Sequence, residues 1–205
     1  MSYIVIDVEA DGPVPHLYSM VSFGAVIVDQ CLDKTFKGEV APISSEWIPR
    51  ALSVSNISRE THLSFRDPEV VMLEFKEWIE KNSVGSPVFI SDNPAFDWQW
   101  INYYFHRFVG ENPFGFSARR IGDLYCGMVK DAGKNAEWKR LYRKTVHDHT
   151  PVNDAKGNAE ALHRGDRNNH TFFTWLVRQH SFSGVRIIYL PGKDGFAGTF
   201  FFQRW

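Results

Sequence analysis

The chain has 205 residues, a formal net charge of −1 and a hydrophobic content of 43%. This length and apolar content predict a compact domain with its own core and exclude a disordered chain. The near-neutral charge excludes attraction of a polyanion by a global basic field, so such a partner would need a local patch or metal ions.

Cysteine usage and hydropathy exclude two further classes of protein. Cys31 and Cys126 lie far apart and form no C-x-x-C pair, so neither a disulfide scaffold nor a cysteine-rich zinc site is expected. No apolar run approaches the roughly 20 residues of a membrane span. The first residues enter an apolar run without the charged region of a signal peptide. We therefore expect a cytoplasmic protein with no membrane partner.

The N-terminal part of the chain predicts three strands. Tyr3 to Val8 is apolar on both faces, as in a buried strand, and Met20 to Asp29 and Thr35 to Ile43 follow after turn residues. The short connections favour antiparallel pairing of neighbouring strands.

Helical patterns dominate the middle of the chain. Pro68 opens an amphipathic helix, and Pro87 to Ile90 is a short apolar strand. Three more helices are expected at Pro94 to Phe108, Ser117 to Lys130 and Pro151 to Leu162. This order predicts an α/β fold in which helices flank a mixed β-sheet.

The last part of the chain differs in composition. We expect residues 1–164 to form one domain and residues 165–205 to form an aromatic extension, in which Val185 to Leu190 and Phe196 to Phe202 could pair as a β-hairpin. Capping of the core, self-association and a poorly adapted terminus remain alternatives for its role.

Asp7-Val8-Glu9 is the first pattern that indicates chemistry. Alternation along a strand places both carboxylates on one face, and two buried acids side by side are costly unless cations neutralise them. A solvated strand end is the simpler alternative. The same spacing at Asp67-Pro68-Glu69 is typical of a helix start.

The segment Asn93-Pro94-Ala95-Phe96-Asp97 directly follows a predicted strand. It places Asp97 in the first turn of a helix, aimed back toward the end of the sheet. The alternative is an acid that interacts only with the helix dipole.

His149 stands five positions before Asp154, which opens the last helix. A second copy of this spacing, from His62, comes before Asp97 and is set aside. His147 beside His149 suggests a histidine zinc site, but the sequence offers no further histidine or cysteine at fixed spacing. A capping or surface histidine is the remaining alternative.

The order of these patterns resembles the DEDDh 3′–5′ exonucleases of the ribonuclease H-like superfamily. The resemblance covers Tyr3 to Leu162, and Thr150 stands where a related subgroup has its tyrosine, so the histidine type is the match. The signature positions are Asp7, Glu9, Asp97, His149 and Asp154. The segments Asp7 to Pro13, Asn112 to Ala118 and His149 to Leu162 also look like the small branch that includes the mycobacterial-type 3′–5′ exoribonucleases.

The resemblance implies a ribonuclease H-like fold and two Mg²⁺ ions, for which Mn²⁺ can substitute. It makes Asp7 the bridge between both ions, with Glu9 and Asp154 on the side of the nucleophile and Asp97 on the side of the leaving group. Two divalent ions can stabilise the attacking and leaving oxygens of a phosphodiester, and Mg²⁺ prefers oxygen ligands. His149 then fits as the general base, because an imidazole accepts a proton near neutral pH.

The resemblance also implies where the terminal nucleotide lies. The candidate substrate-binding residues are Ala10, Asp11, Gly12, Tyr18, Met20 and Phe96. For Asp11 the alternative is a turn cap, and for Phe96 it is packing in the core.

Residues 119–147 are locally basic, and Trp138 and Tyr142 are interleaved with the charges. This pattern is typical of a groove that follows a nucleic-acid backbone and stacks bases. A solvated helix face is an equally good interpretation.

We therefore expect a metal-dependent 3′–5′ exonuclease that hydrolyses phosphodiester bonds at the 3′ end of single-stranded RNA or DNA, or of short oligonucleotides, and releases 5′-mononucleotides. The resemblance implies a homodimer. One alternative is a catalytically silent nucleic-acid-binding or assembly module with the same fold, which the intact set of acids disfavours. Another is an endonuclease of the same superfamily, which the histidine disfavours.

Overall fold

A mixed β-sheet forms the centre of the structure, a computed structural model that describes residues 1–163. Within this range five strands stand in the order β3-β2-β1-β4-β5. They are β1 (Ser2–Ala10), β2 (Met20–Ile27), β3 (Thr35–Glu39), β4 (Pro87–Ser91) and β5 (Ala118–Arg120). The first three strands pair antiparallel, whereas β4 lies parallel to β1 and β5 lies parallel to β4. The predicted mixed sheet is thus confirmed.

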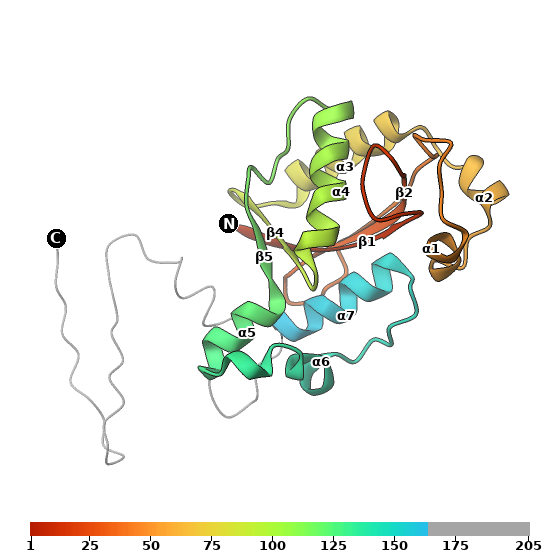
Figure 1. The fold of residues 1–205 in the computed structure, drawn as a ribbon. Coiled ribbons are helices and arrows are strands. Elements are labelled where there is room, and N and C mark those ends of the chain that lie inside the picture. Colours follow the sequence, from red (N-terminus) through yellow and green to blue (C-terminus); the bar gives the residue numbers. More distant parts are fainter. Residues whose placement is uncertain (164–205) are drawn as a thin grey trace, which may run out of the picture.

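Helices cover both faces of this sheet (Figure 1). One face carries α3 (Pro68–Asn82) and α4 (Pro94–Phe108), and the other carries α5 (Ile121–Val129) and α7 (Pro151–His163). The shorter helices are α1 (Pro49–Val54), α2 (Arg59–Leu63) and α6 (Glu137–Tyr142), with a 3-10 turn at Ala132–Lys134. Each long helix buries its apolar side against the sheet, which gives the molecule two hydrophobic clusters.

Side chains alternate between these two clusters along β1. The even-numbered residues from Ile4 to Val8 pack beneath α3 and α4, whereas Val5 packs with α5 and α7. Because successive strand residues point to opposite faces, Asp7 and Glu9 share the face of Val5. Both acids therefore point toward α7 at the carboxyl end of the strand.

One predicted helix begins later than the sequence pattern indicated. The helix expected from Ser117 starts only at Ile121, because Ala118–Arg120 forms the edge strand β5. Ala118 pairs with Phe89 of β4, so tertiary pairing decides the conformation of this segment. The helix start predicted at Asp67 is confirmed, since its carboxylate accepts from the Glu69 N–H at 2.8 Å.

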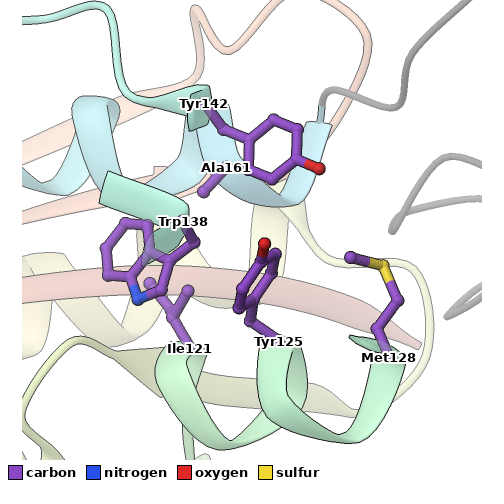
Figure 2. Close-up of a pocket in the computed structure, with 6 residues that line it drawn as sticks. All are labelled: Ile121, Tyr125, Met128, Trp138, Tyr142 and Ala161. Carbon is purple, nitrogen blue, oxygen red and sulfur yellow. The ribbon is translucent and has the colours of Figure 1, made fainter. Parts of the chain in front are cut away.

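Figure 2 shows a small apolar hollow between α5, α6 and α7, with a volume of about 10 Å³. Its lining residues are Ile121, Tyr125, Met128, Trp138, Tyr142 and Ala161. The Trp138 side chain is fully buried there, and Tyr142 is half-buried. Trp138 is therefore not available to stack on bases, because its ring packs in the second hydrophobic cluster.

The C-terminal part of the prediction falls outside this description. The aromatic extension of residues 165–205 and its hairpin at Val185 to Leu190 and Phe196 to Phe202 lie outside the described residues, and the domain boundary at residue 164 remains a prediction.

Within residues 1–163, no helix combines the length and apolar character that a membrane crossing requires.

The start of α7 lies directly on Gly24 of β2. A Cβ atom at Gly24 would come within 2.3 Å of the Pro151 carbonyl carbon and 2.4 Å of the Val152 nitrogen. Gly24 is also the residue that pairs with Asp7 across the two strands. The missing side chain therefore lets α7 begin against the sheet beside Asp7.

We predict that Gly24→Ala pushes the start of α7 away from the sheet. Overpacking of this kind typically lowers the free energy of unfolding by roughly 1–3 kcal/mol, which urea denaturation will measure. Gly127→Ala in α5 is the control, because nothing lies within 4 Å of a Cβ atom there, and alanine favours a helix. Equal stability of the Gly24→Ala protein and wild type would contradict this account.

Candidate active site

Three carboxylates meet where β1 ends beneath α7. Asp7, Glu9 and Asp154 each offer a ligand atom, and these atoms lie within 4.8 Å of one another. Asp154 stands in the first turn of α7, and its side chain is 0% exposed. The contact of α7 with β2 thus brings an acid from the far end of the described chain to two acids of the first strand.

Asp97 reaches the same strand end from the other side of the sheet. It lies in the first turn of α4 and is 5% exposed. Its Oδ1 accepts a hydrogen bond from the Val8 backbone N–H at 3.1 Å. Since Val8 separates Asp7 from Glu9, four predicted site acids gather around one end of β1.

Burial and nearby negative charges make Asp7, Glu9 and Asp97 difficult to ionise. Burial raises the pKa of Asp7 well above its usual range, and the charges of Asp97, Asp154 and Glu9 raise it further. Burial, with the Asp154 charge, raises the pKa of Glu9 to about 7. Burial also raises the pKa of Asp97 to about 7. The site therefore favours any bound cation that neutralises several carboxylates together.

The acids fit a hard divalent cation by their donor chemistry. Within residues 1–163, Asp154 Oδ2 is buried and has no hydrogen-bond partner. A buried carboxylate oxygen without a partner is costly, and a metal ion would satisfy it. Oxygen ligands are those that Mg²⁺ and Mn²⁺ prefer.

His149 lies on the loop before α7, as the sequence predicted. Its Nδ1 lies 3.4 Å from Glu9 Oε1, and its side chain is 41% exposed. The backbone of His149 has φ 59°, which is uncommon for a residue other than glycine. Asp148 supports this turn by accepting from the Thr150 N–H at 2.9 Å. His149 is thus held beside the carboxylates with its ring open to solvent.

Arg143 is a site residue that the motifs missed. Its Nη2 lies 2.5 Å from Asp154 Oδ1, and its Nη1 donates to Asn158 Oδ1 at 3.2 Å. A Cβ atom at Gly157 would come within 2.6 Å of Arg143 Nε, so the glycine makes room for the guanidinium. The sequence marked Arg143 only as one of many basic residues, and this packing carries no sequence signal of its own.

The Asp11 side chain is held by protein groups, as the turn-cap alternative predicts, and its substrate role stays a prediction. Its side chain is fully buried and accepts from the Ser19 N–H at 2.6 Å and from Arg59 Nη1 at 2.8 Å. His62, which the sequence reading set aside, lies with its Nδ1 3.7 Å from Asp11 Oδ2. Burial and the Arg59 charge lower the pKa of His62 to about 4, so this imidazole is neutral at pH 7. The cluster fixes the loop of residues 11–19 to α2.

The other candidate substrate residues divide into buried and accessible groups. Met20 is fully buried, and its backbone N–H donates to Tyr104 Oη at 2.8 Å. Its place near the terminal nucleotide stays a prediction. Ala10 is also buried. Tyr18 is half-buried, and its ring covers Gly12, where a Cβ atom would come within 2.1 Å of Tyr18 Cγ.

Phe96 is half-buried and packs at 6.1 Å, ring centroid to ring centroid, against Trp100. This partial burial fits both interpretations of Phe96, packing in the core and contact with substrate.

A cavity of about 440 Å³ extends from the acids into the basic part of the chain. It is lined by Asp7, Asp92, Lys139, Arg143, Lys144, Thr145, Val146, His147 and Asn158. Two of these basic residues are paired with acids, Lys139 with Asp92 and Arg143 with Asp154. Other basic residues of the stretch form ion pairs at the surface, for example Arg120 with Asp123 and Arg140 with Glu137. The groove expected from residues 119–147 is thus limited to the few cations that line this cavity.

Known proteins resemble this chain in sequence and in fold. The family model of the 3′-5′ exoribonuclease Rv2179c-like domain matches residues 2–165. The Escherichia coli protein named 3′-5′ DNA exonuclease Cap18 is 38% identical over 180 residues, which cover 80% of this chain and 91% of that protein.

Solved structures agree with the fold at low sequence identity. Cell-death related nuclease 4 (CRN-4) matches with a TM-score of 0.64 at 14% identity, over 79% of this chain and 62% of that chain. A full-length 3′-exonuclease matches with a TM-score of 0.61 at 16% identity, over 78% of this chain and 79% of that chain. These matches confirm the ribonuclease H-like fold. The family match confirms the expected enzyme class, a 3′–5′ exonuclease: the chain belongs to the family of the 3′-5′ exoribonuclease Rv2179c-like domain.

Proposed function

We propose that this exonuclease removes 5′-mononucleotides from the 3′ end of single-stranded nucleic acid by a two-metal mechanism with His149 as the general base. The observation that supports this most directly is the convergence of Asp7, Glu9 and Asp154 within 4.8 Å of one another, with His149 bound to Glu9.

Asp7, Glu9, Asp97 and Asp154 would hold two Mg²⁺ ions, and Mn²⁺ can take the same positions. When bound, the ions supply the positive charge that stabilises the attacking and leaving oxygens of the phosphodiester. Asp7 would contact both ions, because its ligand oxygen lies within 4.8 Å of those of Glu9 and Asp154, and Asp97 accepts from the N–H of the next residue, Val8.

His149 accepts the proton of the attacking water. Its Nδ1 contact with Glu9 at 3.4 Å orients the ring, and its solvent exposure of 41% allows the proton to leave after each cycle. A general base of this kind typically contributes a factor of about 10²–10⁴ to the rate.

The nucleic acid enters along the cavity of about 440 Å³ that opens beside Asp7. Lys144 on its wall attracts the phosphates upstream of the scissile bond, and Lys139 joins it when it leaves its ion pair with Asp92. The terminal nucleotide lies near Gly12, Tyr18 and Phe96, where half-buried aromatic rings offer stacking surfaces that tolerate any base.

Both DNA and RNA are candidate substrates. The family is described as exoribonucleases, whereas the Escherichia coli relative is named as a DNA exonuclease. We expect DNA to be cleaved at least as well as RNA, because that relative is matched over 91% of its length. We also expect a homodimer in the cytoplasm, where Cys31 and Cys126, both free in the described part of the chain, stay reduced.

The first prediction tests the reaction itself. 5′-labelled single-stranded DNA and RNA of one sequence are incubated with Mg²⁺ or EDTA and resolved on a gel. We expect a ladder that shortens from the 3′ end only with Mg²⁺. Asp7→Asn should lower the rate at least about a hundredfold, since it removes a carboxylate at the centre of the charged site.

Asp123→Asn is the matched control, because this acid is 70% exposed and, among residues 1–163, pairs with Arg120 alone at the surface. Internal cuts would instead indicate an endonuclease. Absence of cleavage in both wild type and Asp7→Asn would indicate a silent binding module.

The second prediction concerns the stability of the metal-free protein. Asp7, Glu9 and Asp97 have pKa values above their ordinary ones, so their contribution to stability is present below about pH 4 and is lost as the pH rises through about 7. With EDTA we therefore expect Tm to fall between about pH 5 and pH 8, by roughly 2–4 °C for each kcal/mol lost.

Two comparisons isolate this effect from other titrating groups. Mg²⁺ should raise Tm more at pH 8 than at pH 5, and Asp7→Asn should reduce both the fall and the Mg²⁺ effect. If the metal-free wild type and Asp7→Asn proteins show the same pH dependence, these carboxylates do not repel one another as described.

The third prediction separates the general base from the metal ligands. His149→Ala should lower kcat by about 10²–10⁴. The thermal shift caused by Mg²⁺ should persist, because the four acids remain. Unchanged turnover of this variant would exclude His149 as the base.

The fourth prediction tests the anchoring of the loop at residues 11–19. Arg59→Ala removes the cation that holds buried Asp11, so Gly12 and Tyr18 lose their fixed position. We expect KM for a short oligonucleotide to rise roughly fivefold to thirtyfold, the equivalent of 1–2 kcal/mol, with a smaller change in kcat. Arg59→Lys should restore part of the loss, and a variant that changes Tm alone would show a purely structural role.

A further inference from the structure

We propose that His147, His149 and Asp154 form a Zn²⁺ site, and that zinc bound there inhibits the exonuclease. The inhibition rests on the proposed function, because it assigns His149 and Asp154 to hydrolysis. Zinc binding itself depends only on the geometry of the three side chains.

The three ligands already lie together. His147, His149 and Asp154 each offer an atom within 4.8 Å of the others. His147 Nδ1 lies 2.8 Å from Asp154 Oδ1, and the two imidazole rings stand 4.4 Å apart, centroid to centroid. The fold thus supplies the third ligand that the His-x-His sequence lacked.

The carboxylate is fixed, whereas the imidazoles can adjust. Asp154 is 0% exposed, and its Oδ2 has no hydrogen-bond partner within the described chain. The His147 and His149 side chains are 52% and 41% exposed. Small rotations of these open rings can bring their nitrogens to the usual Zn–N distance of about 2.0–2.1 Å.

The chemistry of this set differs from that of the four acids. Two imidazoles and one carboxylate suit Zn²⁺, which accepts three protein ligands and an open fourth position. Mg²⁺ prefers oxygen ligands, so it selects the acids instead. Arg143 Nη2 contacts both Asp154 Oδ1 at 2.5 Å and His147 Nδ1 at 3.4 Å. Asp154 Oδ2 remains for the metal, and a rotation of the exposed His147 ring would take its Nδ1 away from the guanidinium.

Zinc at this site would remove two groups from the reaction. His149 cannot accept a proton while its nitrogen holds the metal, and Asp154 becomes shared between two cations. Zinc should therefore slow hydrolysis even when Mg²⁺ is present in large excess.

Zinc binding can be measured without substrate. The metal-free full-length protein competes with a chromophoric chelator for Zn²⁺, in wild type, His147→Ala and a control, His106→Ala. His106 is exposed on α4 and belongs to neither site. We expect His147→Ala to weaken zinc binding at least tenfold and His106→Ala to leave it unchanged. Equal binding by all three proteins would overturn the zinc site.

Inhibition is measured as the zinc concentration that halves each variant's own Mg²⁺-dependent rate. We expect this concentration to rise at least tenfold in His147→Ala and to stay constant in His106→Ala. Equal inhibition of the two variants would place inhibitory zinc on the acids alone and overturn the proposal.

The two proposals fail in different ways. Zinc binding that depends on His147 in a protein without nuclease activity would overturn the proposed function and keep the zinc site. Metal-dependent nuclease activity in a protein whose zinc affinity is unchanged by His147→Ala would overturn the zinc site and keep the proposed function.

Discussion

Repulsion among buried carboxylates is the constraint on which the arrangement of this molecule depends. Asp7 is buried, and the charges of Asp97, Asp154 and Glu9 all raise its pKa. Like charges repel strongly where water is scarce, so these carboxylates would move apart if the backbone let them. They stay together because each lies on a different rigid position, at the end of β1 or in the first turn of α4 or α7. The hydrophobic clusters on both faces of the sheet stabilise the fold and so offset the repulsion among these carboxylates.

Two glycines make room for close contacts at α7. Gly24 leaves room for Pro151 on the sheet, and Gly157 leaves room for the Arg143 side chain along the helix. The first contact brings Asp154 to the end of β1, and the second seats a guanidinium on its carboxylate. Close packing at Gly24 thus brings the carboxylates together. Close packing at Gly157 places the positive charge of Arg143 beside one of them, which offsets part of their repulsion. A side chain at either glycine would act on the site through packing alone.

The sequence pattern predicted the acids that lie together better than it predicted the edge strand and the side-chain contacts around them. The pattern singled out these acids because Asp7 lies on a strongly apolar strand, whereas Asp97 and Asp154 stand in the first turns of helices. The strand Ala118–Arg120 was missed, because three residues that include two arginines show no apolar alternation and pair only through their neighbour β4. The role of His62 is set by its contact with Asp11 in a distant segment of the chain. The role of Arg143 is set by how the loop before α7 folds back to bring it to Asp154, and a spacing pattern records neither contact.

The loop that carries His149 combines a fixed backbone with an open ring. Glu160 accepts from the Lys144 and Thr145 N–H groups at one end, and Asp148 accepts from the Thr150 N–H at the other. Between these anchors, the imidazole of His149 is half exposed. A base needs both properties, because its position must be reproducible while its proton exchanges with water. The same exposure that lets a proton leave also admits a metal ion, so a zinc-sensitive histidine follows from the way this loop is held.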